Sequence, residues 1–157
     1  DSSSTKAWQF GTGAFTLEYY IFHTSIGNAL YDFHLGGNST NAIWLGKTNS
    51  DTFLVRRAGN TNDIVANHYT SMIKTRRWHH IAVCRNGSGL LQLFVDGALW
   101  GEDTSGGHEY IGGVFQIGAD SGNNYSLDAA YVSSVRFIQG QALYTNSFTP
   151  SGGLLPA

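Results

Sequence analysis

The sequence has few charged residues. Asp, Glu, Lys and Arg make up 13% of its 157 residues, about half the usual ~25% of a globular domain. Lys and Arg together number 9 against 11 acidic residues, so the chain lacks the basic surface with which proteins bind nucleic acids or anionic membranes. We therefore expect no nucleic-acid partner.

Long apolar runs and disulfides are lacking too. No hydrophobic stretch approaches the roughly 20 residues of a transmembrane helix, so we expect no membrane insertion. Cys84 is the only cysteine, which excludes an internal disulfide. Because Cys84 lies in an apolar segment, we expect it to be buried as a small hydrophobic residue and not to react as a thiol.

Glycine and aromatic residues, in contrast, are abundant. The chain has 20 glycines, about twice the usual ~7%, and 13% aromatic residues. Short segments of alternating apolar residues are separated by Gly, Asn and Ser, and no segment has helical spacing. The length is that of one domain. This pattern predicts a single all-β domain without helices.

The segment Arg77–Gly101 is the clearest part of this pattern. We expect three strands joined by a turn at 86–89 and by Asp96-Gly97, a pair typical of a type I′ hairpin turn. The spacing of Val132 and Val135 interrupts the alternation of the last strand and predicts a β-bulge at 133–134. The strands expected along the chain are 15–22, 30–35, 42–46, 52–56, 77–85, 90–95, 98–100, 114–117 and 129–138, and residues 63–69 form either a weaker strand or part of a long loop.

Three segments resemble a known family. Residues 10–20 (FGTGAFTLEYY) are similar to its strand F-G-T-G-x-F-T-[IL]-E-x-[WY]. Residues 78–85 (WHHIAVCR) and 91–97 (LQLFVDG) are similar to W-x-H-[IV]-A-V-x-R and L-x-L-[YF]-V-[DN]-G. Residues 132–137 (VSSVRF) and 140–150 (GQALYTNSFTP) are similar to [IV]-x-x-[VI]-R-[IF] and G-x-A-x-Y-T-x-x-F-T-P.

These motifs, in this order, resemble the concanavalin A-like lectin/glucanase superfamily. The likeness is to its laminin-G-like branch, of the kind found in phage structural proteins and microbial surface proteins. The resemblance implies a jelly-roll sandwich of two antiparallel sheets, formed by one domain over residues 1–157. The polar tail from Gly140 is expected to lie over the sandwich, and 1–6 and 151–157 are expected to be loose.

The chain departs from the resemblance at two places. Relatives commonly have a strand before the first motif, whereas only six residues precede Ala7. Either the full chain starts earlier, or the sheet edge beside the last strand is open to strand addition by a neighbouring subunit. Relatives also often carry an acidic pair where Ser133-Ser134 stands, so the sequence identifies no partner for Arg136.

Carboxylates suited to glycoside hydrolysis are scarce. The enzymes of this superfamily need acidic residues crowded on one strand, but the glutamates are only Glu18, Glu102 and Glu109. We place Glu102-Asp103 in a loop and expect Glu18 to be hydrogen-bonded to backbone or to a tyrosine. His79 and His80 should face opposite sides of a strand and not chelate one ion, with His80 a hydrogen-bonded core residue. We therefore expect no enzymatic activity.

Two kinds of binding site are expected instead. Relatives often hold calcium with loop Asp and Asn residues, and oxygen ligands suit this ion. The best loop for it contains Asp120, Asn123, Asn124 and Asp128. Sugar binding needs aromatic rings beside polar side chains, and the candidates are Trp44, Trp100, Tyr31 and Tyr125.

The sequence thus predicts a non-enzymatic structural or adhesion module with glycan-binding capacity. The expected location is extracellular, on a virion (tail, fibre or capsid decoration) or a cell surface. The expected partners are other subunits of that assembly, copies of the same chain in a homo-oligomer, and glycans. One alternative is a purely structural subunit that self-assembles through an open sheet edge, and another is a glycoside hydrolase.

Overall fold

The computed structural model describes residues 9–27, 30–35, 43–57, 61–111, 115–118, 127 and 129–152, with only the backbone for 30–35 and 61. Alternating apolar residues form short strands throughout this part of the chain. The elements are β1 (Phe15–His23), β2 (Leu30–Leu35), β3 (Ile43–Lys47), β4 (Thr52–Arg57), β5 (Thr61–Asn67), α1 (Tyr69–Met72), β6 (Trp78–Arg85), β7 (Leu91–Val95), β8 (Ala98–Asp103), β9 (Phe115–Ile117) and β10 (Ala130–Gln139).

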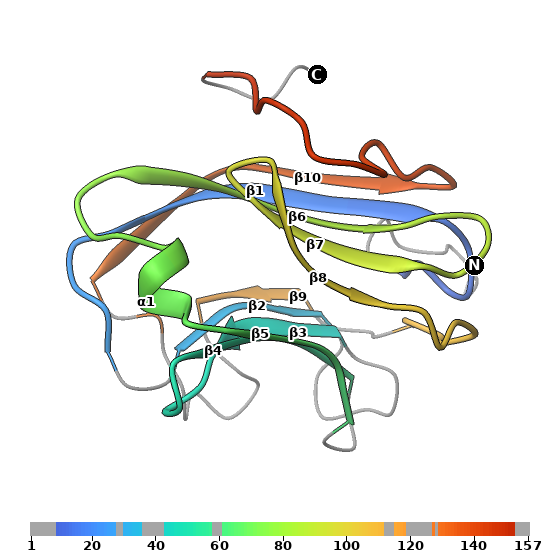
Figure 1. Ribbon diagram of the computed structural model, residues 1–157, viewed down its shortest axis with the longest axis horizontal. Helices are drawn as coiled ribbons and strands as arrows, with labels where there is room; N and C mark the ends of the chain where they lie inside the picture. The colour runs from blue at the N-terminus through green and yellow to red at the C-terminus, as the bar shows by residue number, and fades with distance from the viewer. Residues whose placement is uncertain are drawn as a thin grey trace, which may run out of the picture.

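The strands form two antiparallel sheets. The first sheet has the order β10-β1-β6-β7-β8, and the second has the order β5-β4-β3-β2-β9. Figure 1 shows the two sheets as stacked layers. The expected all-β sandwich is confirmed. No helix in the described part of the chain is long and apolar enough to cross a membrane.

The core lies between the sheets. Phe15, Leu17, Tyr19 and Ile21 occupy alternate positions of β1 and are fully buried, as the period-2 pattern predicts. At one side, the end strands β5 and β8 approach each other. A Cβ atom at Gly101 would lie 2.5 Å from Ile64 Cγ2, so this contact between the sheets requires glycine.

Two expectations about secondary structure are wrong. β8 continues through Asp103, so Glu102 and Asp103 belong to a strand and not to a loop. One helical turn, α1, occurs where none was expected. Its side chains Tyr69 and Met72 are buried in the core, so tertiary packing stabilises a turn that has no helical period in the sequence.

The turn at Asp96-Gly97 has the predicted geometry. Both residues have positive φ, 49° and 77°, as a type I′ turn requires. The C-terminal tail lies directly on this turn, because Phe148 N donates to Gly97 O at 2.9 Å. A Cβ atom at Gly97 would lie 1.9 Å from Phe148 O. Glycine is therefore required here both for φ and for space.

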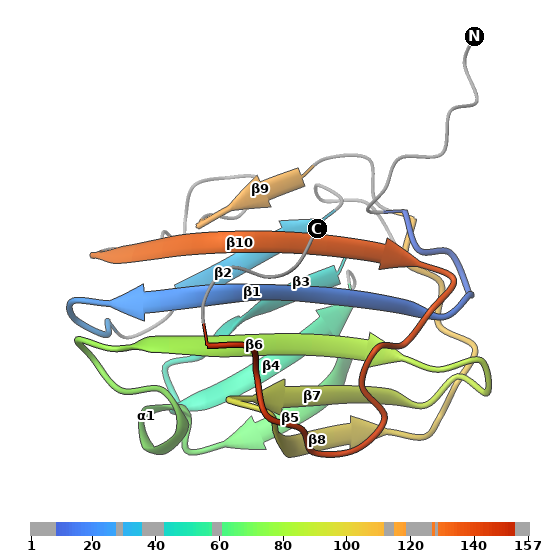
Figure 2. The ribbon, with the colours of Figure 1, turned by 90° about the horizontal axis from the view of Figure 1, so that it is seen from above.

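The tail crosses the outer face of the first sheet, as expected (Figure 2). Tyr144 and Phe148 stack with ring centroids 3.6 Å apart. With Ala142 they pack on buried residues of the sheet, among them Phe94 and Cys84. Cys84 is 1% exposed, which confirms its predicted burial.

The last strand, β10, forms an end of the first sheet. The predicted bulge is present: the register with β1 shifts between Glu18 and Tyr20, and Ser134 has φ 52°. Among the described residues, no strand pairs with the outer edge of β10. Residues 1–8 and 153–157 lie outside the described part, so the missing first strand and the loose ends there stay predictions. Of the expected loose end 151–157, Ser151 is described, and its carbonyl oxygen accepts from Tyr20 OH.

Candidate functional site

Glu18 is the centre of a buried polar network beneath the tail. His80 Nε2 lies 2.9 Å from Oε2, Tyr144 OH donates to Oε2 at 3.0 Å, and Arg136 Nε donates to Oε1 at 2.6 Å. Burial alone would raise the pKa of Glu18, but these three partners together lower it. The expected tyrosine partner is confirmed, and Arg136 has the partner that the sequence did not identify.

The neighbouring histidines of β6 belong to different networks. His80 is 1% exposed and bonded to Glu18, which confirms the predicted core histidine. His79 Nδ1 lies 2.7 Å from Asp96 Oδ2, and its Nε2 lies beside the Lys74 backbone. The two rings hold different parts of the structure together and do not chelate one ion jointly.

A second polar cluster, which the sequence analysis missed, lies where β5 meets β8. Asp63, Asp103 and His108 offer ligand atoms within 4.8 Å of one another. His108 Nε2 is 2.9 Å from Asp103 Oδ2 and 3.7 Å from Asp63 Oδ1. Asp63 is far in sequence from Asp103 and His108, and it meets them because two sheet edges come together, a relationship that no local motif signals.

The partners of this cluster favour a structural role. Arg57 Nε donates to Asp63 Oδ1 at 2.6 Å, and Tyr110 OH donates to Asp63 Oδ2 at 2.5 Å, so both oxygens are engaged. Ser105 Oγ and Asp103 Oδ2 both approach the same nitrogen, Nε2 of His108. In a Ser-His-Asp triad the serine and the aspartate contact opposite ring nitrogens. The cluster therefore lacks triad geometry.

The predicted calcium loop belongs to the part of the chain that the structure does not describe. Asp120, Asn123, Asn124 and Asp128 lie outside the described residues, as does Tyr125. Tyr31 is described by its backbone alone, opposite Gly46 in the register of β2 and β3. The calcium site stays a prediction.

The two remaining aromatic candidates lie on different sheets. Trp100 stands on β8 of the first sheet, at a register shift between Leu93 and Phe94, and is 40% exposed. Trp44 stands on β3 of the second sheet. The structure does not bring them together, so they cannot form one site.

Trp44 belongs to a row of residues that crosses all of the second sheet. Its neighbours Ile43 and Leu45 are buried in the core, so position 44 is on the outer face. The register pairs Trp44 with Arg56 and with position 34, pairs position 34 with Gln116, and pairs Arg56 with Asn62. We call this set the Trp44 row: Gln116, His34, Trp44, Arg56 and Asn62, with His34 placed by backbone register only.

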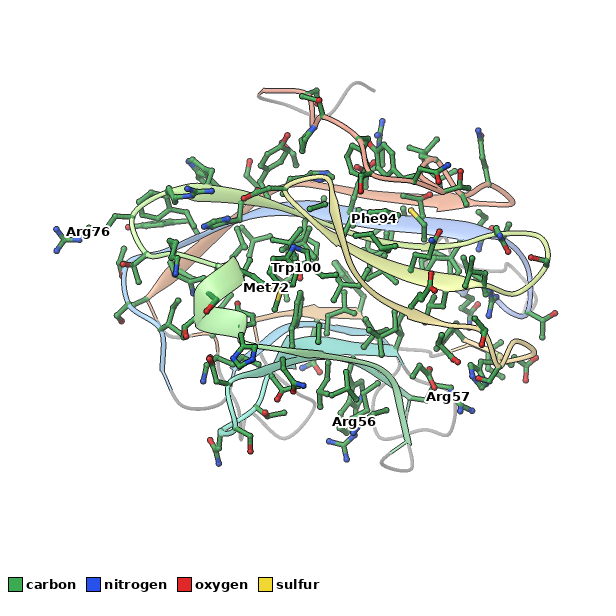
Figure 3. The ribbon with its side chains drawn as sticks, in the orientation of Figure 1. Arg56, Arg57, Met72, Arg76, Phe94 and Trp100 are labelled. Carbon is green, nitrogen blue, oxygen red and sulfur yellow. The ribbon has the colours of Figure 1, made fainter. Side chains whose placement is uncertain are left out.

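The side chains of the Trp44 row combine an aromatic ring, amides and a cation. The Arg56 guanidinium carbon lies 5.2 Å from the centroid of the Trp44 ring, a cation–π contact. Figure 3 shows Arg56 projecting from the second sheet on the side away from the first. Gln116 Oε1 is buried and has no hydrogen-bond partner among the described residues. Aromatic and convergent polar groups of this kind are what sugar-binding surfaces present.

Known proteins with the same two-sheet fold are similar to this chain. The model of the family Laminin_G_3, described as the concanavalin A-like lectin/glucanases superfamily, matches residues 1–143. No curated protein sequence matches the chain. Among solved structures, mouse laminin alpha1 domains LG4-5 are similar, with a TM-score of 0.59 and 15% identity over 92% of this chain. The chain spans 40% of that laminin fragment.

Two bacterial modules are also similar in structure. One is CBM40 of the Ruminococcus gnavus IT-sialidase, bound to α2,3-sialyllactose, with a TM-score of 0.64, 14% identity and coverage of 85% of this chain and 79% of that one. The other is domain 4 of a Geobacillus stearothermophilus extracellular arabinanase in complex with arabinotriose. Its TM-score is 0.56, its identity 12%, and its coverage 84% of this chain and 63% of that one. Such low identities show the fold alone, and the family model shows that the chain belongs to the concanavalin A-like lectin/glucanase superfamily as a laminin-G-like domain.

Proposed function

We propose that this domain is a non-catalytic carbohydrate-binding module and that its binding surface is the outer face of the second sheet around the Trp44 row. The observation that carries the proposal is the register that aligns Trp44, Arg56, Gln116 and Asn62 across four of its strands. Carbohydrate sites combine ring faces with fixed hydrogen-bonding groups. The Trp44 row supplies both kinds of group on a rigid sheet.

Two carboxylates with buried side chains support a non-catalytic role. Glycoside hydrolysis needs an acid and a base or nucleophile that can reach the sugar. Glu18 is fully buried and bonded to three side chains. The Asp63 side chain is 1% exposed and bonded to Arg57 and Tyr110. Both carboxylates are occupied in holding the fold.

The structural relatives support the same ligand class. The CBM40 module and the arabinanase domain are each described in complex with a sugar. We extend this class, and no particular sugar, to the present chain. Display on a virion or cell surface rests on the sequence resemblance alone, and immunogold labelling of the native particle or cell would test it.

A glycan array tests the proposal directly. The purified domain is applied with and without calcium, and the array is repeated with Trp44→Ala and with Trp100→Ala as a matched control on the other sheet. We expect binding that Trp44→Ala abolishes and Trp100→Ala leaves intact. Absence of binding to every glycan contradicts the proposal, and loss of binding only with Trp100→Ala moves the site to β8. Binding that EDTA abolishes supports the calcium prediction.

Self-assembly is a second candidate function, because no described strand pairs with the outer edge of β10. An exposed strand edge offers unpaired backbone groups to another chain. Sedimentation velocity over a wide concentration range tests it. Concentration-dependent oligomers that Val132→Pro disrupts would favour this function, whereas a monomer at every concentration would contradict it.

A further inference from the structure

We infer that a docking surface for a partner protein lies on the outer face of the first sheet, at the end where β6 and β10 begin. It consists of Phe22, Trp78, Tyr131 and Arg76, and we call it the Trp78 patch. The partner presents a non-helical segment in which an apolar side chain stands beside carboxylates. The inference does not depend on the proposed carbohydrate binding, which uses the other sheet.

The aromatic residues of the Trp78 patch form one row across three strands. The register pairs Phe22 of β1 with Tyr131 of β10 on one side and with Trp78 of β6 on the other. The ring centroid of Phe22 lies 5.5 Å from that of Trp78 and 6.1 Å from that of Tyr131. Phe22 follows the core residue Ile21, so the row is on the outer face. Trp78 is 47% exposed and Tyr131 63%, and contiguous exposed rings of this kind mark interaction sites.

The C-terminal tail covers a neighbouring part of the same face and shows what kind of segment this face accepts. The rings of Tyr144 and Phe148 pack on Phe94, and Phe148 also packs edge-on against His80. Beneath the tail, Phe94 and His80 are at most 1% exposed. A segment without regular secondary structure is therefore held on this sheet by its aromatic side chains.

The described part of the tail ends one row before the Trp78 patch. Tyr20 OH donates to Ser151 O, and Tyr20 precedes Phe22 on the outer face of β1. Figure 2 shows the tail crossing the sheet away from the end where β6 and β10 begin. Among the described residues, no segment covers the Trp78 patch. A partner can make there the kind of contact that the tail makes on the rest of the face.

Basic residues border the Trp78 patch. Arg76 N donates to His23 O at 2.7 Å, which fixes Arg76 beside the end of β1. Figure 3 shows its side chain projecting from this end of the sandwich, and it makes no hydrogen bond or ion pair with any described residue. Lys74 Nζ donates to a backbone carbonyl, and Arg77 pairs with Asp96. Residues 74–77 and Asp96 together carry a positive charge in a protein of net charge −2.

The chemistry of the Trp78 patch favours a protein partner. The Phe22 ring is inclined by 56° to Trp78 and by 60° to Tyr131, so the rings form notches and not a flat platform for stacking sugars. Trp, Tyr and Arg are the residues that most often dominate protein interfaces. A positive border is complementary to carboxylates on the partner. Two copies facing each other through this patch would bring like charges together, which opposes a symmetric dimer here.

Selection from a peptide library tests the inference. A yeast-displayed library of random linear peptides is sorted for binding to the wild-type domain and against binding to the Trp78→Ala variant. We expect the enriched peptides to combine Phe, Trp or Leu with Asp or Glu. If no peptide is enriched for the wild type over the variant, or if the enriched peptides lack acidic residues, the inference is overturned.

Fluorescence anisotropy of an enriched peptide then measures the contribution of each group. Trp78→Ala and Tyr131→Ala should each weaken binding about tenfold or more, as the loss of a central interface side chain implies. Arg76→Gln should weaken it less, with an effect that disappears at high salt, and Arg76→Lys should restore most of the affinity. The matched control is Trp100→Ala, which removes a tryptophan that is 40% exposed on β8 of the same sheet. Equal losses with Trp100→Ala and Trp78→Ala would overturn the inference, and circular dichroism establishes that each variant is folded.

Other occupants of the Trp78 patch give different results. Cosedimentation with phosphatidylserine vesicles that Trp78→Ala abolishes, without peptide enrichment, would assign the patch to a membrane surface. Oligomers that Trp78→Ala dissociates would assign it to a second copy of the chain. Peptide binding that appears only after residues 153–157 are deleted would assign it to the chain's own C-terminus. Each of these results overturns the inference, and none of them decides whether carbohydrate binds at the Trp44 row.

Discussion

Glu18 and Arg136 lie directly opposite each other on β1 and β10, and the guanidinium binds a carboxylate that solvent does not reach. His80 and Tyr144 bind the other carboxylate oxygen, so one side chain joins β1, β6, β10 and the C-terminal tail. Because Glu18 is held by partners on three separate segments, we expect it to be a main determinant of stability.

Glu18→Gln tests this expectation. The substitution keeps the shape but leaves Arg136 without its anion, and breaking a buried pair in this way costs about 3–5 kcal/mol. Urea unfolding at pH 7 measures the loss. Since the pKa of Glu18 is lowered in the folded state, its contribution is present above the unfolded pKa and is lost as pH falls through the folded one. The wild-type protein should therefore lose more stability in acid than the variant. A variant as stable as wild type at pH 7 would show that the network is not needed.

We expect His23 to lower the stability of the folded protein in mild acid. Burial, and then the nearby His79, lower the pKa of His23 from 6.5 to about 4. Its Nε2 lies 3.0 Å from Tyr69 OH, and its Nδ1 is buried with no partner among the described residues. Between these two pKa values the unfolded chain binds the extra proton and the folded chain does not. Stability from this residue is therefore full above pH 6.5 and falls toward pH 4.

The effect of His23 on the free energy of unfolding is large enough to measure as a slope against pH. One proton of difference changes the free energy of unfolding by about 1.4 kcal/mol per pH unit. Urea unfolding at intervals from pH 7 to pH 4.5 should show this slope in the wild type. His23→Gln, which retains a hydrogen-bonding group for Tyr69, should have a shallower slope over the same range. Identical slopes would mean that His23 titrates normally in the folded protein.

The contact between Gly97 and Phe148 should hold the C-terminal tail on the first sheet. Gly97→Ala would place a methyl group 1.9 Å from Phe148 O at a residue with φ 77°, so either the turn or the tail must move. The backbone conformation alone costs about 1–2 kcal/mol. We expect a lower melting temperature and faster proteolysis after Tyr144. The matched control is Gly107→Ala, where φ is 72° and nothing lies within 4 Å of the added atom, so that only the contact with the tail differs. Equal effects of the two substitutions would contradict the proposed contact.

Strands and turns were predictable from the sequence because their signals are local. The alternation of apolar residues in 15–22 indicates an extended strand and which side chains share a face. The pair Asp96-Gly97 indicates a type I′ turn, and neither signal depends on the rest of the chain. The turn of helix at Tyr69–Met72 was missed because it depends on burial against distant residues. The end of β8 was missed because Glu102-Asp103 is polar, although β7 supplies its backbone partners.

The candidate site was only partly predictable for the same reason. Trp44 was selected as an aromatic residue near polar segments, but its contact with Arg56 depends on the register of β3 and β4. The positions of Gln116 and Asn62 in the same row depend on the order of the five strands. Asp63 and His108 meet only where the two sheets meet. Composition and spacing do not contain this information.

The central claim is that carbohydrate binds at the Trp44 row, and the indole N–H signals of the labelled domain test it most directly. The chain has four tryptophans, whose signals are assigned with single Trp→Phe variants. The domain is titrated with the tightest-binding oligosaccharide while ¹H–¹⁵N spectra are recorded. We expect the Trp44 signal to shift in proportion to saturation while those of Trp78 and Trp100 stay in place. Movement of the Trp100 or Trp78 signal with Trp44 unchanged would contradict it.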